Sequence, residues 1–231
     1  MTARRTSAPF GDEIARFHRL DATGFAFQAP SCHGEGDWPT ASGELHLHDA
    51  TRDRRQRVTM LHESLFAACY AWLLPRGGLL LHAATLWLGG RAFVVAGPST
   101  AGKSTLAERF APNWWSDEHA FLQRDGDAWF VMRHAEFRAN QGPFPWRVPL
   151  AGLLWLGPER TQSRLTPLTV GTALPRILPQ ALVAGPVTSG PVLDAVAQLS
   201  RLVPVAELSH CLATPLPQLA AIIAGVADAA A

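Results

Sequence analysis

Hydrophobic residues gather along the chain in runs and alternations that predict β-strands. A continuous apolar run over residues 79–88 predicts a buried strand. Gly89 and Gly90 follow it directly, and a glycine pair between two apolar segments is typical of a two-residue hairpin. We therefore expect the next apolar segment, residues 91–96, to return antiparallel beside the first strand.

Further strands are predicted on both sides of this hairpin. Upstream, alternating patterns over residues 17–29 and 43–49 flank a stretch rich in Gly, Pro, Ser and Asp, residues 30–42, which we interpret as a loop. Downstream, an Asp-Gly turn that begins at Asp125 joins two more strands. The downstream strands are predicted over residues 119–123, 128–133, 150–156 and 203–208.

Helical periodicity predicts helices between and after these strands. Apolar positions recur at helical spacing over residues 59–74, and Pro75 ends the pattern. Thr214 as N-cap and Pro215 at the first helical position predict a C-terminal helix. Two further helices are expected over residues 169–183, interrupted by prolines, and 191–202. The chain is therefore expected to be α/β, with a β-rich N-terminal segment, residues 1–58, packed on a larger unit, residues 59–231.

The composition indicates a folded protein that works in water. Of the 231 residues 48% are hydrophobic and 17% are charged, and the net charge is +1. These values exclude a disordered chain and do not favour nucleic-acid binding. The cysteines, Cys32, Cys69 and Cys211, lack metal-binding spacing, which favours a reducing compartment. No apolar run reaches the roughly 20 residues that cross a bilayer. We expect a cytoplasmic protein that binds neither membrane nor nucleic acid and could form a homo-oligomer.

Chemistry is most clearly indicated at residues 97–104, which read G-x-x-x-x-G-K-S, the phosphate-binding loop or P-loop. An apolar strand leads into the motif and helix-compatible residues lead out, as the motif requires. Glycines let successive backbone N–H groups point at phosphate oxygens, and the start of the next helix adds its positive dipole end. Lys103 would reach the β- and γ-phosphates and Ser104 would bind Mg²⁺. The expected nucleotide-binding residues are Gly97, Pro98, Ser99, Thr100, Ala101, Gly102, Lys103, Ser104 and Thr105.

Lys103 is the only lysine in the chain, because the other 19 of the 20 Lys and Arg residues are arginines. A lysine ammonium is a compact point charge that the planar guanidinium of arginine does not reproduce. A lysine at this one position favours phosphate binding over a chance match to a glycine-rich turn. ATP and Mg²⁺ are therefore the expected cofactors.

An acidic pair, Asp117 and Glu118, follows the predicted P-loop helix. Phosphoryl transfer uses one carboxylate at Mg²⁺ and another that orients or deprotonates the attacking hydroxyl. We predict that Asp117 is the base and that Glu118 assists the metal; the reverse assignment, and a solvated turn without function, stay open. His82 lies in the apolar strand before the P-loop, where it could tune the pKa of a carboxylate or be a core residue.

Two other groups of polar residues are candidate sites. A long loop rich in Gly and Pro is predicted over residues 134–149, and loops of this length are commonly functional. Within it Arg138, Asn140 and Arg147 could contact the transferred phosphate or an acidic substrate, or could be solvated. His46 and His48 share one strand face, but without a third ligand at a fixed spacing they are better interpreted as surface histidines.

Three motifs together resemble the HPr kinase/phosphorylase catalytic domain, and more closely the small HPr-kinase-related proteins often found in peptide-modification gene clusters. They are Leu80-Leu81-His82-Ala83-Ala84, the P-loop with Thr105, and Ser116-Asp117-Glu118. The resemblance spans about residues 75–160. It implies a mixed β-sheet flanked by helices, a histidine near the reacting phosphate and kinase activity. At Thr105 and Glu118 the chain differs from the HPr kinases, which usually carry Glu and Asp there.

Two classes of function are compatible with these features. The first is an ATP-dependent kinase that phosphorylates a Ser or Thr hydroxyl of a small protein or peptide or, as second choice, a small molecule. The other is an ATP-binding switch or assembly factor that transfers no phosphoryl group. The acidic pair and His82 favour the kinase, because a switch needs a metal ligand but no second carboxylate and histidine at the γ-phosphate.

Overall fold

The computed structural model describes residues 16–21, 23–29, 32–37, 39–40, 42–47, 67–111, 113–116, 118–133, 145–158, 160–183 and 186–228. The chain divides into two compact units. One comprises Met1–Gly77 and Leu182–Asp194, and the other comprises Gly78–Ala181 and Ala195–Ala231. The predicted boundary between residues 58 and 59 lies outside the described residues and stays a prediction.

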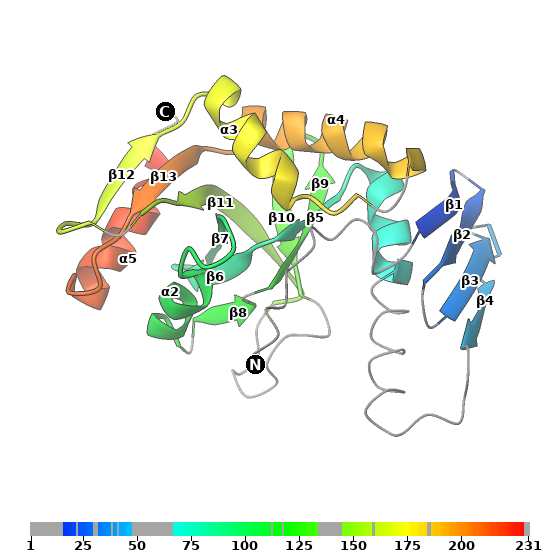
Figure 1. Cartoon of the computed structure of the whole chain (residues 1–231), viewed down its shortest axis with the longest axis horizontal. Helices are drawn as coiled ribbons and strands as arrows, with labels where there is room; N and C mark the ends of the chain where they lie inside the picture. Colours follow the sequence, from blue (N-terminus) through cyan, green and yellow to red (C-terminus); the bar gives the residue numbers. More distant parts are fainter. Residues whose placement is uncertain are drawn as a thin grey trace, which may run out of the picture. The chain divides into compact units, whose positions relative to one another are not determined.

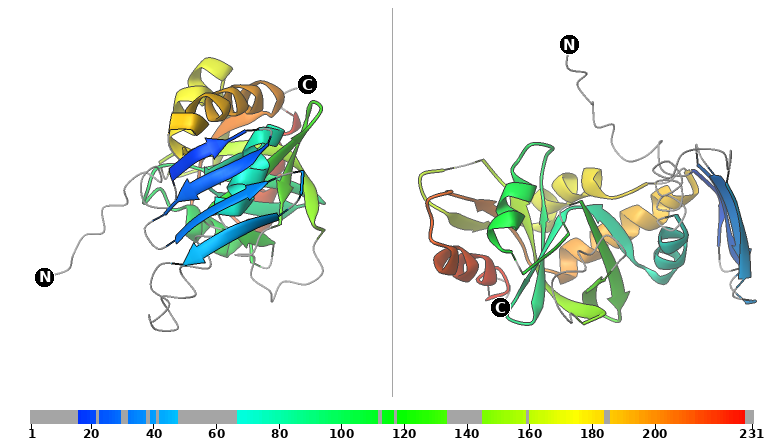
Figure 2. Two further views of the ribbon diagram at one scale, coloured as in Figure 1. Left: turned by 90° about the vertical axis from the view of Figure 1, so that its right-hand side faces the viewer. Right: turned by 90° about the horizontal axis from the view of Figure 1, so that it is seen from below.

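The first unit contains a four-stranded antiparallel sheet in the order β1-β2-β3-β4 (Figure 2). Residues 67–73 form a helix that continues into the 3₁₀ turn η1 (Leu74–Arg76). Phe17 of the sheet packs against Phe27 and against Tyr70 of this helix, with ring centroids 5.7 and 5.6 Å apart. The strands are β1 (Arg16–Leu20), β2 (Gly24–Gln28), β3 (Cys32–Asp37) and β4 (Ser42–Leu47).

Strand β3 lies within the stretch that the sequence analysis assigned to a loop, so that assignment was wrong. The glycines that suggested a loop instead make room for aromatic rings of β2. A Cβ at Gly34 would lie 2.8 Å from the ring of Phe27, and a Cβ at Gly36 would collide with the ring of Phe25. Glycine at these positions therefore serves close packing between paired strands.

The second unit is built on a mixed sheet in the order β5-β9-β10-β11-β7-β6-β8, with β13 also paired to β11 and β12 to β13 (Figure 1). The pairs β7–β11 and β11–β13 are parallel and the others are antiparallel. The strands are β5 (Leu79–His82), β6 (Ala84–Leu88), β7 (Arg91–Ala96), β8 (Trp114–Ser116), β9 (His119–Asp125), β10 (Ala128–Met132), β11 (Arg147–Leu156), β12 (Arg164–Pro167) and β13 (Val205–Ser209). The expected α/β class with a mixed sheet is confirmed.

The sheet curls because its two ends are connected through bent stretches of chain. Residues 79–88 were predicted as one strand but form two, β5 and β6, which are separated by Ala83 and lie near opposite ends of the strand order. In the same way β8 pairs with β6 while β9, next along the chain, pairs with β5. The curl is visible in the right panel of Figure 2.

The two predicted hairpin turns are confirmed. Gly89 and Gly90 both have positive φ, 58° and 79°, and Leu88 pairs with Arg91 across them. Gly126, with φ of 59°, lies in the turn between β9 and β10. Glycine adopts these left-handed conformations without the strain that a Cβ would add, so the local sequence was sufficient to predict both turns.

Helices α2 (Lys103–Arg109) and α5 (Leu216–Ala224) pack on one face of this sheet, where their apolar residues share a core with β6, β7, β11 and β13. The remaining helical segments are α3 (Val170–Ile177), η3 (Leu178–Gln180) and α4 (Pro186–Leu202). Helix α4 begins five residues before its predicted start. At α5 Pro215 takes the N-cap position, and Thr214, the predicted cap, shares a 2.7 Å hydrogen bond with Ser163. None of the described helices is long and apolar enough to span a membrane.

Replacing Gly152 with alanine is expected to lower the free energy of unfolding by about 1–3 kcal/mol, the usual cost of overpacking a core. Gly152 is buried in β11, and a Cβ there would collide with Val226, which is 1% exposed. Val226→Ala removes the colliding methyl groups, so the double variant should recover part of the loss. Urea unfolding followed by tryptophan fluorescence measures both effects, and an unchanged midpoint in Gly152→Ala would contradict the packing.

Candidate functional site

The P-loop begins directly after β7 and turns sharply before α2. Gly97 lies against the end of β11, since a Cβ there would be 3.2 Å from Cβ of Leu156. Further along, Thr100 and Gly102 have φ of 71° and 91°. This left-handed conformation is uncommon for a β-branched residue and is found mainly where function or packing requires it. The backbone N–H of Ala101 donates to the carbonyl of Pro98 at 3.2 Å, which closes the loop into a compact turn.

Lys103, the first residue of α2, is folded back beneath the loop. Its side chain is only 7% exposed, and Nζ donates to the carbonyl oxygens of Gly97 at 2.9 Å and Pro98 at 3.1 Å. Burial lowers the pKa of the Lys103 ammonium below its ordinary value, because removal from water penalises the charged form. Ser104 and Thr105, the next residues of α2, are exposed.

The strand order places several chain segments at the same edge of the sheet as the P-loop. Strands β7, β11 and β13 are parallel and in register, with Trp155 paired to both Ala96 and Glu207, so their carboxyl ends meet at this edge. Strand β6 runs antiparallel to β7 and therefore begins here, and β8 ends here with Ser116 paired to Thr85. The P-loop thus lies between the segment of β6 and β8 on one side and that of β11 and β13 on the other.

The structure brings His82 and Glu118 together on the β6 and β8 side. The N–H of Ala83, the residue after His82, donates to the carbonyl of Glu118 at 3.1 Å. His82 is half-buried and pairs across the sheet with His119, with ring centroids 6.4 Å apart. The buried Ser116 hydroxyl accepts from the N–H groups of Glu118 and His119 and so holds the turn between β8 and β9. Glu118 is exposed and follows β8, which is two strands from β7 in the strand order.

Several residues selected from the sequence lie outside the described residues: Asp117, Arg138, Asn140 and His48. Their assigned roles stay predictions. His46 is exposed, 3.3 Å from a carboxylate oxygen of Glu44, and stacks on His33. Among the residues that the structure describes, no three His, Cys, Asp or Glu side chains form a group that could hold a metal ion.

Arg147 lies on a strand and not in the loop where the sequence analysis placed it. It is the first residue of β11 and pairs with Met132. Its guanidinium donates to Asp125 at 2.7 Å and lies 3.6 Å from the ring centroid of Phe130. The end of β11 that contacts the P-loop, Leu156, is nine positions further along the strand. The proline and glycine residues near Arg147 suggested a loop, but pairing with β10 extends strand β11 to Arg147.

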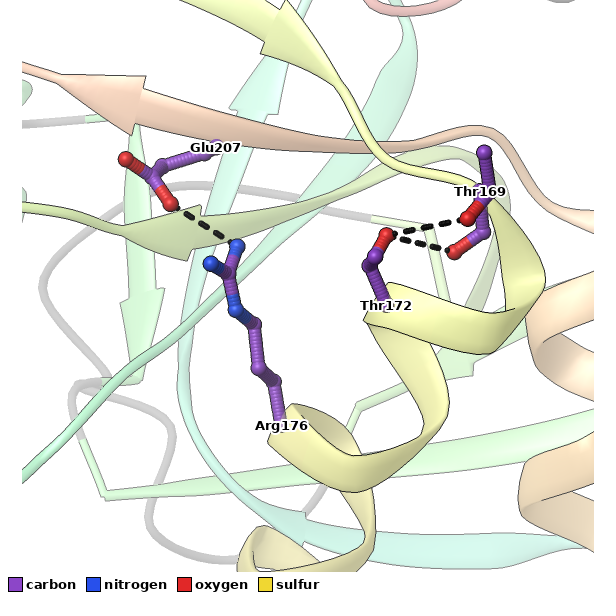
Figure 3. Close-up of polar contacts among 4 residues, drawn as sticks. All are labelled: Thr169, Thr172, Arg176 and Glu207. Carbon is purple, nitrogen blue, oxygen red and sulfur yellow. Dashed lines mark hydrogen bonds and ion pairs between the residues drawn. The ribbon is translucent and has the colours of Figure 1, made fainter.

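A cavity of about 680 Å³ adjoins the P-loop on the β11 and β13 side. The loop contributes residues 98–102 and Thr105 to its wall. On the opposite wall, Nη1 of Arg176 in α3 donates to Oε2 of Glu207 in β13 at 2.8 Å (Figure 3). The other lining residues are Trp155, Leu156, Gly157, Pro158, His210 and Leu212.

No residue of this opposite wall was predicted as a site from the sequence. Arg176, Glu207 and His210 are far from the P-loop along the chain and carry no motif. His210 is buried, and its Nε2 lies 3.9 Å from where a Cβ on Gly102 would be. All three residues lie in or just after a helix or strand that the sequence predicts. Their position alone does not point to a site, because only the parallel pairing of β13 with β11 brings them to the edge of the sheet where the P-loop lies.

Comparison with known proteins adds two similarities. A model of the family described as SynChlorMet cassette protein ScmC matches residues 46–144. No curated protein matches the chain. Among solved structures, the chain is similar to the Hpr(Ser) kinase/phosphatase from Coxiella burnetii, with 9% identity and a TM-score of 0.34 over 65% of this chain and 89% of that chain. The segment that matches the ScmC family contains the hairpin, the P-loop and the acidic pair.

Proposed function

We propose that this protein is an ATP-dependent kinase that transfers the γ-phosphate to a Ser or Thr hydroxyl of a small protein or peptide. The observation that carries the proposal is Lys103, the only lysine of the chain, buried beneath the loop with Nζ on two loop carbonyls. Among the described residues its hydrogen-bond partners are neutral carbonyls, and a buried ammonium without an opposite charge is costly. The phosphates of a nucleotide would supply the missing negative charge.

The residues at this edge of the sheet fit the needs of phosphoryl transfer. Mg²⁺, when bound, would neutralise charge on the β- and γ-phosphates. The exposed hydroxyl of Ser104 and the exposed carboxylate of Glu118 are oxygen donors of the kind that Mg²⁺ prefers. Asp117 would orient the acceptor hydroxyl and take its proton, and His82, beside Glu118 at this edge, would tune the pKa of a carboxylate.

Two features favour a kinase over a nucleotide-dependent switch. Glu118 and His82 lie on one side of the P-loop, and the chain there is fixed by hydrogen bonds from Ala83 and to Ser116. A switch needs a metal ligand but gains nothing from a histidine beside it, or from the second carboxylate that the sequence predicts at Asp117. The choice of a kinase over a switch therefore rests on these side chains, whereas nucleotide binding rests on Lys103.

The test incubates the protein with γ-labelled ATP and with the small proteins and peptides encoded by neighbouring genes. Label is expected on Ser or Thr of one of them, located by mass spectrometry. Lys103→Ala serves as the control for contaminating kinases and should transfer no label. Tight ATP binding together with no labelled product from any neighbour would contradict the kinase and favour the switch.

A further inference from the structure

We infer that the cavity beside the P-loop binds the nucleoside half of the nucleotide, with Glu207 accepting hydrogen bonds from the ribose hydroxyls. The inference rests on the proposed function, since it takes the P-loop as the site of the phosphates. It assigns a role to the wall formed by Trp155, Arg176, Glu207 and Leu212.

The composition of the cavity wall indicates which end of a nucleotide it faces. Loop residues 98–102 and Thr105 line the cavity, whereas Lys103 and Ser104 do not. In a P-loop these two side chains serve the β- and γ-phosphates and Mg²⁺. Glu118 and His82, at the same edge, also lie outside the wall. The reacting end of the triphosphate therefore belongs on the β6 and β8 side, which leaves the cavity for the α-phosphate end and the nucleoside.

The negative charge of Glu207 favours binding of a neutral ligand group with hydrogen-bond donors at this wall and disfavours a phosphate there. A carboxylate only accepts hydrogen bonds and repels anions. Its Oε2 accepts from Arg176, and Oε1 lies 3.1 Å from where a Cβ on Gly157 would be, so any larger residue at this position would crowd the oxygen. The side chain is 27% exposed. The vicinal hydroxyls of a ribose offer two donors, and a carboxylate on a ribose hydroxyl is also how many dinucleotide sites hold their ligand.

Helix α3 positions the arginine that holds Glu207. At its start the hydroxyl of Thr172 donates to the carbonyl of Thr169 at 2.9 Å (Figure 3). Just before the helix, the N–H of Leu168 donates to the carbonyl of Val205 in β13 at 2.8 Å. Arg176 lies one turn after Thr172 and extends toward Glu207 (Figure 3). Only Nη1 of its guanidinium is used among the described residues, so Arg176 fixes one carboxylate oxygen and leaves the other for a ligand.

The rest of the wall suits a flat, mostly apolar base. Trp155 lies on the same face of the sheet as Glu207, because the two residues pair directly in β11 and β13. Pro158 and Leu212 add apolar surface, and Leu212 is 48% exposed although it is a large aliphatic side chain. The volume of about 680 Å³ is within the roughly 300–1,000 Å³ common for small-molecule sites.

The experiment measures Mg²⁺-dependent binding of three probes by titration calorimetry: ATP, 2′,3′-dideoxy-ATP and inorganic tripolyphosphate. In the wild type, dideoxy-ATP should bind about tenfold more weakly than ATP, the usual value of a charge-assisted hydrogen bond. Glu207→Gln should lower the affinity for ATP by a similar factor and leave the affinities for dideoxy-ATP and tripolyphosphate unchanged. Asp125→Asn is the matched control, since it breaks a second carboxylate–arginine pair among the described residues of this unit, at Arg147, away from the cavity.

The outcomes separate this inference from the function on which it rests. Equal wild-type affinities for ATP, dideoxy-ATP and tripolyphosphate would overturn the nucleoside site but keep the phosphate site. An equal loss of affinity for all three probes in Glu207→Gln would also overturn the nucleoside site, because Glu207 would then affect binding through the conformation of the P-loop and not through the ribose. If none of the probes binds the wild type, the proposed function fails and the inference fails with it. The wild-type comparison of ATP with dideoxy-ATP decides the inference even if Glu207→Gln does not fold.

Discussion

Lys103→Ala is expected to weaken Mg-ATP binding about 100-fold or more and to leave the protein folded. Removing one partner of a buried, hydrogen-bonded charge pair typically costs about 2–5 kcal/mol, and each 1.4 kcal/mol is tenfold in affinity. The fold should tolerate the change, because a lysine whose pKa is lowered by burial costs the native state stability at neutral pH. Titration calorimetry gives the affinity, and thermal unfolding reports on the fold.

Arg91→Ala is the matched control for this variant. It also removes one positive charge, but from an exposed residue at the start of β7, at the opposite end of that strand from the P-loop. Its ATP affinity should equal that of the wild type. If Lys103→Ala binds Mg-ATP as tightly as Arg91→Ala does, the assignment of the P-loop as the phosphate site is wrong.

Asp117→Asn is expected to slow phosphoryl transfer roughly 10²-fold or more while ATP binding is retained. The physical reason is that the amide cannot take the proton of the attacking hydroxyl, and a positioned base usually contributes about that factor. Single-turnover transfer to the acceptor found by labelling, with ATP at saturating concentration, measures this step separately from binding. A wild-type rate in Asp117→Asn would exclude the base assignment.

Glu118→Gln distinguishes the roles of the two carboxylates, Asp117 and Glu118. If Glu118 assists the metal, the amide variant should need a higher Mg²⁺ concentration for half-maximal transfer and should approach the wild-type rate when Mg²⁺ is saturating. A rate loss that Mg²⁺ cannot restore in Glu118→Gln, together with a shifted Mg²⁺ requirement in Asp117→Asn, would support the reverse assignment of the pair.

The parts of the molecule that sequence reasoning predicted correctly depend on short-range physics. The turns at Gly89 and Gly126 need positive φ, and glycine supplies it without strain. The P-loop spacing places Lys103 at the first position of a helix that follows a buried strand. The acidic residue Glu118 was expected at a strand end and lies between β8 and β9. In each case a few consecutive residues carry all the information.

The errors and omissions concern contacts between residues that are distant along the chain. Gly34 was assigned to a loop because it is a glycine, but it lies in a strand where the ring of Phe27 on the neighbouring strand leaves no room for a Cβ. Arg147 appeared to be a loop residue until pairing with β10 extended β11 to it. Arg176 and Glu207 carry no local signal, since their ion pair and the cavity beside it exist only because β13 aligns parallel to β11. Strand order depends on how whole faces of helices and sheets are buried against each other, and a short window of the sequence does not contain that information. The P-loop could therefore be located from the sequence, because it is a local motif, whereas the cavity beside it could not.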